Sequence, residues 1–333
     1  MKKQVRMADI AEKLGISIVS VSKALRGKDG VSEELRARVM LTAQELGYIS
    51  RNEEENVSGF SIGILTSSRY LERGTSFYWS LYERLLLHLS SGKDFGMLEV
   101  ISDADERGCA IPRVVLENRV QGIIIMGKLS PAYIKMIAGL GIPFTLLDTY
   151  EIGMPYDTVL SAGYAGMCEM THYLLERGHR RLKFVGRVGS TSSISDRYYG
   201  FCRAMTDFGI PVTPDMEISD RDESGVSQIE LNEDILRGVT GLVCNCDYTA
   251  YTVLTKLGAL GIRVPDDISI VGFDNYILSE MGNVGITTYA IDQNEMAIAS
   301  AAQIRRRILH PGAKRQTVTV CGEILERESV KRN

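Results

Sequence analysis

Three charged residues stand at or near the ends of apolar runs. Asp148 closes "FTLLD", Asp274 closes "ISIVGFD", and Arg197 lies in "DRYYGF". Carboxylates and a guanidinium in such places form paired hydrogen bonds with neighbouring hydroxyl groups, which is how a protein orients a sugar or a purine. The alternative for Asp274 and Arg197 is a salt bridge that braces two loops. These residues predict a binding site for a small polar ligand.

The chain lacks the sequence patterns of several common catalytic folds. It contains no G-x-x-x-x-G-K-[ST] phosphate loop, no G-x-G-x-x-G segment after a strand and no G-x-S-x-G elbow. Its six cysteines include no C-x-x-C pair, so neither a zinc site nor a disulfide framework is predicted. His172 and His179 have no nucleophile or metal ligand at a suggestive spacing and are interpreted as helix-surface and turn residues. We expect no catalytic residue, no metal and no cofactor.

The candidate ligand residues must be positioned by alternating strands and helices. Amphipathic stretches of helical length separate seven β-branched runs, namely "FSIGIL", "GMLEVIS", "GIIIMG", "PFTLLD", "LKFVG", "GLVCN" and "ISIVGF". This alternation is typical of βαβ units and parallel sheets, and seven strands exceed what one small sheet needs. The sequence therefore predicts an α/β core of two doubly wound subdomains, with ligand-facing loops at the carboxyl ends of the strands.

The first fifty residues have a different pattern, that of three short helices. Ala8 to Leu14 is apolar on one face, Gly15 allows a tight turn, and Ser17 is a good N-cap for a second helix. Ser32 begins a third helix, which is expected to end at Gly47. This segment holds nine Lys and Arg against six Asp and Glu, a charge of +3, whereas the whole chain carries -4. The cations therefore gather on the helical segment.

The composition of the chain and the lengths of its apolar runs predict where in the cell the protein is found. At 333 residues, 44% hydrophobic and 24% charged, the chain can bury more than one core. Lys2, Lys3 and Arg6 are followed by no apolar run of signal-peptide length, and no later run is long enough to span a bilayer. We therefore expect a cytoplasmic protein that makes no membrane contact.

The chain resembles bacterial transcription regulators of the LacI/GalR type along nearly its whole length. The resemblance is carried, in order, by "MADIAEKLGISIVSVSKAL", "VSEELRARV", "AQELGYI", "VQGIII", "GIPFTLLD", "LLERGHRRLKFVG", "DRYYGF", "VPDDISIVGFDN", "ITT" and "LERES". It implies a helix-turn-helix domain that reads operator DNA over residues 1–50, a hinge over 51–59, and over 60–333 a sensor core similar to periplasmic sugar-binding proteins, working as a homodimer.

The resemblance assigns roles to the second helix. A recognition helix places its N-terminal side chains against base edges in the major groove. By position in the family pattern, Ile18, Val19 and Lys23 would face bases, whereas phosphates or neighbouring bases would be held by Ser17, Ser20, Ser22 and Arg26. Lys23 stands where the family often has arginine, and it lacks the fixed fork of a guanidinium. The alternative is a helical hairpin whose outward side chains face water.

The hinge departs from the family pattern. Where a short helix with a minor-groove leucine is expected, the chain reads "RNEEENVSG", and Val57 is the only residue that could act as a wedge. Glu53, Glu54 and Glu55 would be electrostatically unfavourable near phosphates. A solvated acidic linker is the alternative to a hinge helix that contacts DNA.

Further residues of the expected cleft follow from the resemblance. Phe77 and Tyr78 occupy the aromatic position at the mouth of the first subdomain, and Cys246 and Asp247 stand where the family commonly has Asn-Asp. Arg221 replaces an aromatic ring that often stacks on the ligand. With Arg187 nearby, this cleft suits a phosphorylated or carboxylated ligand. The alternatives are core packing for the aromatic rings and a solvent-facing loop for Arg221.

These observations predict a repressor controlled by a sugar or sugar derivative bound between two core subdomains. The first subdomain takes residues 60–159 and 291–319, and the second takes 160–290 and 320–333. An enzyme on a doubly wound fold with a helical docking module is a competing hypothesis, and a transport-type binding protein is a third that would need export. DNA retention that weakens steeply with salt distinguishes the regulator from both.

Overall fold

Two separate packing units divide the chain, and each is described by itself. They are Met1–Gly59 and Phe60–Asn333. The computed structural model describes residues 6–25, 30–46, 59–71, 77–154, 156–223, 225–276 and 284–333. The predicted hinge residues up to 58, Arg26 of the recognition helix and the predicted helix end at Gly47 lie outside the described residues.

The N-terminal unit contains the three predicted helices, α1 (Met7–Leu14), α2 (Ile18–Leu25) and α3 (Glu33–Leu46). The Ser17 hydroxyl accepts a hydrogen bond from the backbone N–H of Ser20 at 3.0 Å, which confirms the predicted N-cap of α2. Gly15 adopts a left-handed conformation with φ +66° at the turn before α2. A small core holds the helices together; its buried members are Ile10, Ala11, Val21, Ala24, Val39 and Ala43.

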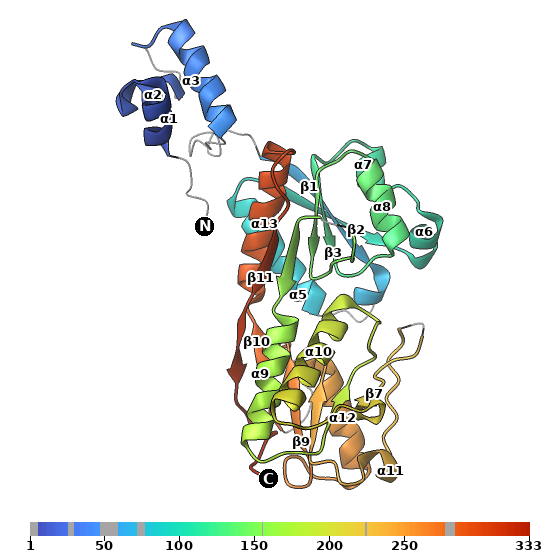
Figure 1. Ribbon diagram of the computed structural model, residues 1–333. Helices are drawn as coiled ribbons and strands as arrows, with labels where there is room; N and C mark the ends of the chain where they lie inside the picture. Colours follow the sequence, from blue (N-terminus) through green and yellow to red (C-terminus); the bar gives the residue numbers. More distant parts are fainter. Residues whose placement is uncertain are drawn as a thin grey trace. The chain divides into compact units, whose positions relative to one another are not determined.

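The second unit is built on two six-stranded sheets (Figure 1). The first sheet has the order β11-β5-β4-β3-β1-β2 and is parallel throughout. Its strands, in chain order, are β1 (Ser61–Ser67), β2 (Phe95–Ile101), β3 (Gly122–Met126), β4 (Phe144–Leu147), β5 (Thr158–Ser161) and β11 (Thr317–Val320).

The second sheet has the order β12-β10-β9-β8-β6-β7. It is parallel except for β12, which runs antiparallel to β10. Its strands are β6 (Leu182–Val185), β7 (Glu217–Ile218), β8 (Gly241–Cys244), β9 (Ser269–Phe273), β10 (Thr287–Ile291) and β12 (Gly322–Leu325). The chain therefore changes sheet after β5, after β10 and after β11.

Helices follow the strands as expected for doubly wound sheets. Around the first sheet lie α5 (Phe77–Ser91), α6 (Asp103–Gly108), α7 (Arg113–Leu116), α8 (Pro131–Gly139) and α13 (Gln293–Leu309), preceded by the short 3-10 helix η1 (Ser68–Tyr70). Around the second lie α9 (Gly163–Glu176), α10 (Ser192–Asp207), η2 (Pro214–Met216), α11 (Glu233–Leu236) and α12 (Asp247–Ala259). α13 packs against α5 and against strands of the first sheet. A helix from near the end of the sequence therefore joins a layer whose other members come from the first half of the core.

All seven predicted strand runs are strands, which confirms the predicted fold class. The runs did not include β5, β7, β10, β11 or β12. β7 has two residues, and β11 is half-exposed with an alternating pattern of polar threonines, so neither forms the continuous apolar run that marks a buried parallel strand.

Candidate functional site

Asp148 is the first polar residue after β4, and it is buried. Its Oδ2 accepts a hydrogen bond from the Tyr78 hydroxyl at 2.8 Å, and its Oδ1 accepts one from the Ser161 hydroxyl at 3.0 Å. The backbone there is left-handed, with φ +56°, which turns the chain sharply at the end of the strand. Burial raises the pKa of Asp148, and the Arg197 charge acts in the opposite direction. Asp148, Tyr78 and Arg197 therefore share one electrostatic environment, and their contact with a ligand stays a prediction.

An aromatic wall stands beside Asp148. The Tyr78 ring centroid lies 4.5 Å from that of Tyr70, and Phe77 meets Tyr78 edge-on at 5.4 Å. Sequence reasoning named Phe77 and Tyr78 but missed Tyr70. Its signal was available, because Tyr70 closely follows β1 and parallel strands end at a common edge.

Arg197 connects the strand ends of the second sheet. Its side chain is buried on α10, Nη1 donates to the Asn245 carbonyl oxygen at 2.7 Å, and the guanidinium lies 4.0 Å from the centroid of the Phe273 ring. Buried Nε has no hydrogen-bond partner among the described residues. A buried donor without an acceptor is costly, so this nitrogen is suited to meet a ligand oxygen.

Asp274 follows β9 and adopts φ +90°, a second left-handed carboxylate at a strand end. Its Oδ1 accepts the Tyr276 backbone N–H at 3.1 Å. Burial raises the pKa of Asp274 to about 7, although the Arg197 charge lowers it, and the Asp148 charge adds to the rise. The structure therefore brings Asp148, Arg197 and Asp274 under mutual electrostatic influence.

Raising the pH is expected to destabilise the core through Asp274. The pKa is about 7 in the folded protein and 3.8 for the free side chain, so the folded state binds the extra proton between those values. The stabilisation of the folded state by this proton is fully present below about pH 4, and it is lost as the pH rises through about 7. Asp274→Asn should flatten the slope of melting temperature against pH between 5 and 8. Parallel slopes for the two proteins would contradict this assignment.

Three contacts join the two subdomains around these residues. Lys128 Nζ donates to the Ser190 carbonyl oxygen at 2.8 Å, and the Ser193 hydroxyl donates to the Asp148 carbonyl oxygen at 3.3 Å. The Tyr150 hydroxyl donates to Asp196 Oδ1 at 2.8 Å. In the structure, loops that belong to the two sheets are therefore in direct contact.

Asp247 was predicted to face the ligand, but the structure places its side chain deep in the core. Its side chain is fully buried at the start of α12, and its pKa is raised well above the usual range by burial, then by the Asp274 charge. Its Oδ1 lies so near Gly272 that a Cβ built there would be 2.0 Å away. Asp247 thus takes part in the packing between α12 and β9, and its contact with a ligand stays a prediction.

Gly272→Ala is expected to destabilise the core because the new methyl group would overlap the Asp247 carboxylate. Overpacking of this kind costs about 1–3 kcal/mol. Combining it with Asp247→Ala should restore part of the loss, because the carboxylate that blocks the methyl is then absent. Urea denaturation of both single variants and the double variant measures the coupling, and strictly additive losses would exclude the contact.

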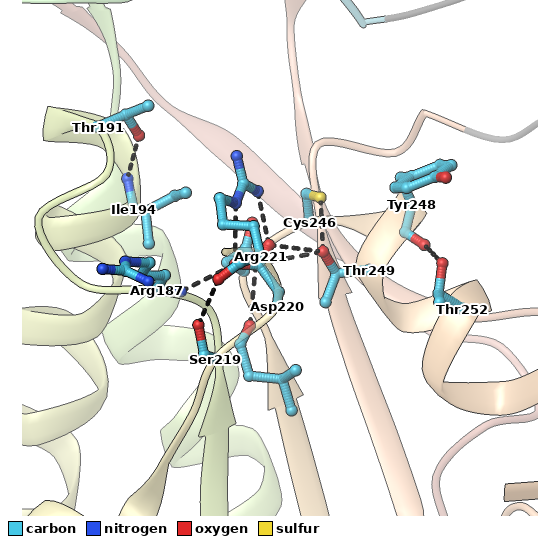
Figure 2. Close-up of polar contacts among 12 residues, drawn as sticks. Arg187, Thr191, Ile194, Ser219, Asp220, Arg221, Cys246, Tyr248, Thr249 and Thr252 are labelled. Carbon is cyan, nitrogen blue, oxygen red and sulfur yellow. Dashed lines mark hydrogen bonds and ion pairs between the residues drawn. The ribbon is translucent and has the colours of Figure 1, made fainter. Parts of the chain in front are cut away.

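Arg221, which was expected from the sequence to face a phosphorylated or carboxylated ligand, is paired with a carboxylate of its own chain. Its Nε donates to Asp220 Oδ1 at 2.9 Å and its Nη2 to Asp220 Oδ2 at 2.5 Å, a paired arrangement visible in Figure 2. Asn245 Nδ2 and the Thr249 hydroxyl donate to Asp220 Oδ2 as well, at 2.9 and 3.3 Å. The positive charge of Arg221 is therefore already offset, and its role toward a ligand stays a prediction.

Cys246 lies on the rim of this network. Its Sγ is 3.3 Å from the Thr249 hydroxyl (Figure 2), and burial, followed by the Asp274 charge, raises the pKa of the thiol to about 11. The thiol is therefore protonated at neutral pH. Sequence reasoning missed Asp220, although this buried carboxylate organises Arg221, Asn245 and Thr249.

Two pockets open beside these residues. One of about 340 Å³ is lined by Asp274, by Ser80 and Arg84 of α5, and by the start of α13. The other, of about 490 Å³, is lined by Arg221, Arg187 and Lys183 together with Asp215, Glu217 and Glu230. Carboxylates accompany the cations in the second pocket, so it is not a purely cationic site.

The helical unit presents a separate candidate site. Ile18 and Val19, at the start of α2, are 51% and 64% exposed despite being apolar, and Lys23 is exposed on the same helix. Val21 and Ala24 of the same helix are buried. Ser17 is exposed and caps the helix, while Ser20 and Ser22 are half-buried. Exposed apolar residues at a helix start suit contact with thymine methyl groups.

Two protein families match the chain. The one described as "Bacterial regulatory proteins, lacI family" matches residues 6–51, and "Periplasmic binding protein-like domain" matches residues 171–330. The HTH-type transcriptional regulator RegA of Clostridium saccharobutylicum is 26% identical over 329 residues, covering 96% of this chain and 98% of that protein. The HTH-type transcriptional repressor PurR of Pasteurella multocida is 24% identical, covering 97% and 98%.

Solved structures agree with the two-part fold. The complex of the transcriptional regulator CelR with cellobiose is 20% identical with a TM-score of 0.68, covering 98% of this chain and 99% of that chain. The lac repressor dimer bound to operator and the anti-inducer ONPF is 19% identical with a TM-score of 0.65, covering 99% and 100%. None of the described helices combines the length and apolar composition needed to cross a membrane. These relatives are transcription regulators, and this chain carries a helix-turn-helix domain of the lacI family of bacterial regulatory proteins followed by a periplasmic-binding-protein-like domain.

Proposed function

We propose that the protein is a homodimeric, cytoplasmic transcription repressor whose affinity for operator DNA is set by a neutral polyhydroxyl ligand, a sugar or a close derivative. The ligand binds where the loops of the two core sheets meet. The observation that carries this proposal is the buried group of Asp148, Arg197 and Asp274 at the strand ends. Ligand-bound neighbours of the same fold hold cellobiose and ribose.

The charge balance of the group favours a neutral ligand. Asp148, Asp274 and Asp247 are buried carboxyl groups, and Arg197 is the cation that acts on the first two. Arg221 is already paired with Asp220. The raised pKa values of these carboxyl groups indicate that burial makes negative charge unfavourable at this place, which disfavours a phosphate or carboxylate, whereas hydroxyl groups can donate to the carboxyl oxygens and accept from Arg197 Nε.

The regulatory mechanism follows from the contacts that join the subdomains. Lys128 to Ser190 and Tyr150 to Asp196 hold the loops of the two sheets together. A ligand that binds both sets of loops stabilises this arrangement relative to an opened one. It can alter DNA binding only by its differential affinity for the two arrangements.

A thermal-shift screen of matched pairs tests the proposal. Each neutral sugar is compared with its phosphate, using the full chain and the Arg221→Ala variant. A neutral sugar at about a hundred times its dissociation constant should stabilise the protein by roughly 2.7 kcal/mol, with the phosphate weaker. Stabilisation by the phosphate alone, lost in Arg221→Ala, would instead support the anionic ligand predicted from sequence. A hit is then added to the protein on operator DNA, and unchanged affinity would refute the regulatory role.

A further inference from the structure

Three side chains of the types that bind zinc meet on the helix pair α9 and α10. Cys168 and His172 are one helical turn apart on α9, and Asp207 is the last residue of α10. One ligand atom from each lies within 4.8 Å of the others. They are separate from the residues assigned to the ligand cleft and to DNA.

The packing of the two helices fixes this meeting point. Residues four apart project from one helix face, so Cys168 and His172 both point toward α10. The helices approach closely at Gly200, where a Cβ would lie 2.2 Å from the Tyr164 carbonyl oxygen. The His172 ring also meets the Phe208 ring edge-on at 5.3 Å, which holds the imidazole in place.

The contact between His172 and Asp207 is a loose ion pair. His172 Nε2 is buried and lies 3.5 Å from Asp207 Oδ2, longer than a good hydrogen bond. Arg203 Nε donates to both oxygens of Asp207, at 2.8 and 3.0 Å, from a side chain that is 60% exposed. Arg203 is therefore able to hold Oδ1 while Oδ2 turns to another partner, as outer-shell groups do for metal-bound carboxylates.

The spacing and the types of the three donor atoms indicate which ion the cluster favours. Zinc binds sulfur at about 2.3 Å and nitrogen or oxygen at about 2.0–2.2 Å, so the donors around one ion are about 3–4 Å apart. Closing the present arrangement by about 1 Å reaches that spacing. A thiolate and an imidazole favour zinc-like ions over magnesium or calcium, which prefer oxygen ligands.

We propose that Cys168, His172 and Asp207 bind a zinc-like divalent ion that clamps the C-terminal half of α9 to the end of α10, with solvent completing the coordination. The thiol releases its proton to the solvent when the ion binds. Thiolate and carboxylate together balance the two positive charges of the ion. No zinc site was predicted from the sequence, and this set was not considered there, because Asp207 is brought close by the packing of a second helix.

Cobalt(II) titration of the full-length, untagged protein tests the site directly. Wild type is expected to bind one cobalt per chain with a near-ultraviolet thiolate-to-cobalt charge-transfer band. Cys168→Ser should lose that band completely. Cys202→Ser is the matched control, because Cys202 is also half-buried on this helix pair but is not part of the cluster, and it should keep the band. Absence of the band in wild type, or its persistence in Cys168→Ser, would overturn the proposal.

Thermal unfolding with zinc provides a second measurement, in which the variant leaves Cys168 unchanged. One equivalent of zinc should raise the melting temperature of wild type, and His172→Gln should abolish at least most of that rise while folding normally without metal. An equal rise in wild type and His172→Gln would place the zinc elsewhere and refute the site. Because His172 packs at a partly exposed position, this variant decides the question even if Cys168→Ser proves unstable.

Discussion

Asp274→Asn is expected to weaken ligand binding by roughly 10- to 150-fold, because each hydrogen bond to a charged group contributes about 1.5–3 kcal/mol. Asparagine is the right replacement. It tolerates the left-handed backbone at φ +90° and keeps an oxygen that can accept the Tyr276 N–H. When it is measured above the pKa of about 7, the loss therefore reports the charge of the carboxylate and its second acceptor oxygen, with little change in local structure.

Calorimetry with a ligand from the matched screen measures the effect of Asp274→Asn. Asp266→Asn is the control, because it also removes a carboxylate near the second sheet but from a side chain that is 61% exposed. DNA affinity without ligand should be unchanged in both, since the helical unit packs separately from the core. Ligand affinity equal to that of wild type in Asp274→Asn would show that the cleft assignment is wrong.

Lys23→Ala is expected to weaken operator binding by about 1–3 kcal/mol, or roughly 5- to 150-fold. Lys23 is exposed on α2 beside the exposed Ile18 and Val19, so its removal leaves the helical core intact. The dependence of affinity on salt separates two roles. If Lys23 binds a phosphate, the variant should bind all DNA sequences more weakly, with a salt slope smaller by about one. If Lys23 binds a base, the variant should instead show a relaxed sequence preference.

Two variants control for charge and shape at Lys23. Lys256→Ala removes the same charge from an exposed position on α12 of the core, and operator affinity should not change. Lys23→Arg keeps the charge but introduces the planar fork, so it should alter base preference more than overall affinity. If Lys23→Ala behaved like Lys256→Ala in gel-shift titrations, α2 would not be the recognition helix.

The strand pattern was predictable because buried parallel strands read as apolar runs whatever their partners. The order of strands within each sheet was not, because β5 and β11 meet only after the chain has passed through the second sheet. Ser17 and Ser32 were predictable as caps for a local reason, since each hydroxyl accepts from an N–H three residues later.

The pairing of Arg221 could not be predicted from its position. Neighbouring residues in a strand point to opposite faces, so Asp220 and Arg221 would be expected to diverge. β7 ends at Ile218, and the chain then forms an isolated antiparallel bridge between Arg221 and Ser227. That irregular loop turns both side chains toward each other. Asp247 is similar, because its depth depends on Gly272, which belongs to a strand distant in sequence.

The last two described strands, β11 and β12, determine when each sheet can be completed during synthesis of the chain. β11 and β12 are separated by Cys321 alone, and each forms an edge of a different sheet. A nascent chain that has not yet reached Thr317 leaves β5 and β10 without their outer partners, and unpaired strand edges promote aggregation. The first sheet is completed by β11 and the second by β12, which follows after a single residue. Premature termination before Thr317 would therefore damage both halves of the sensor at once, rather than one half alone.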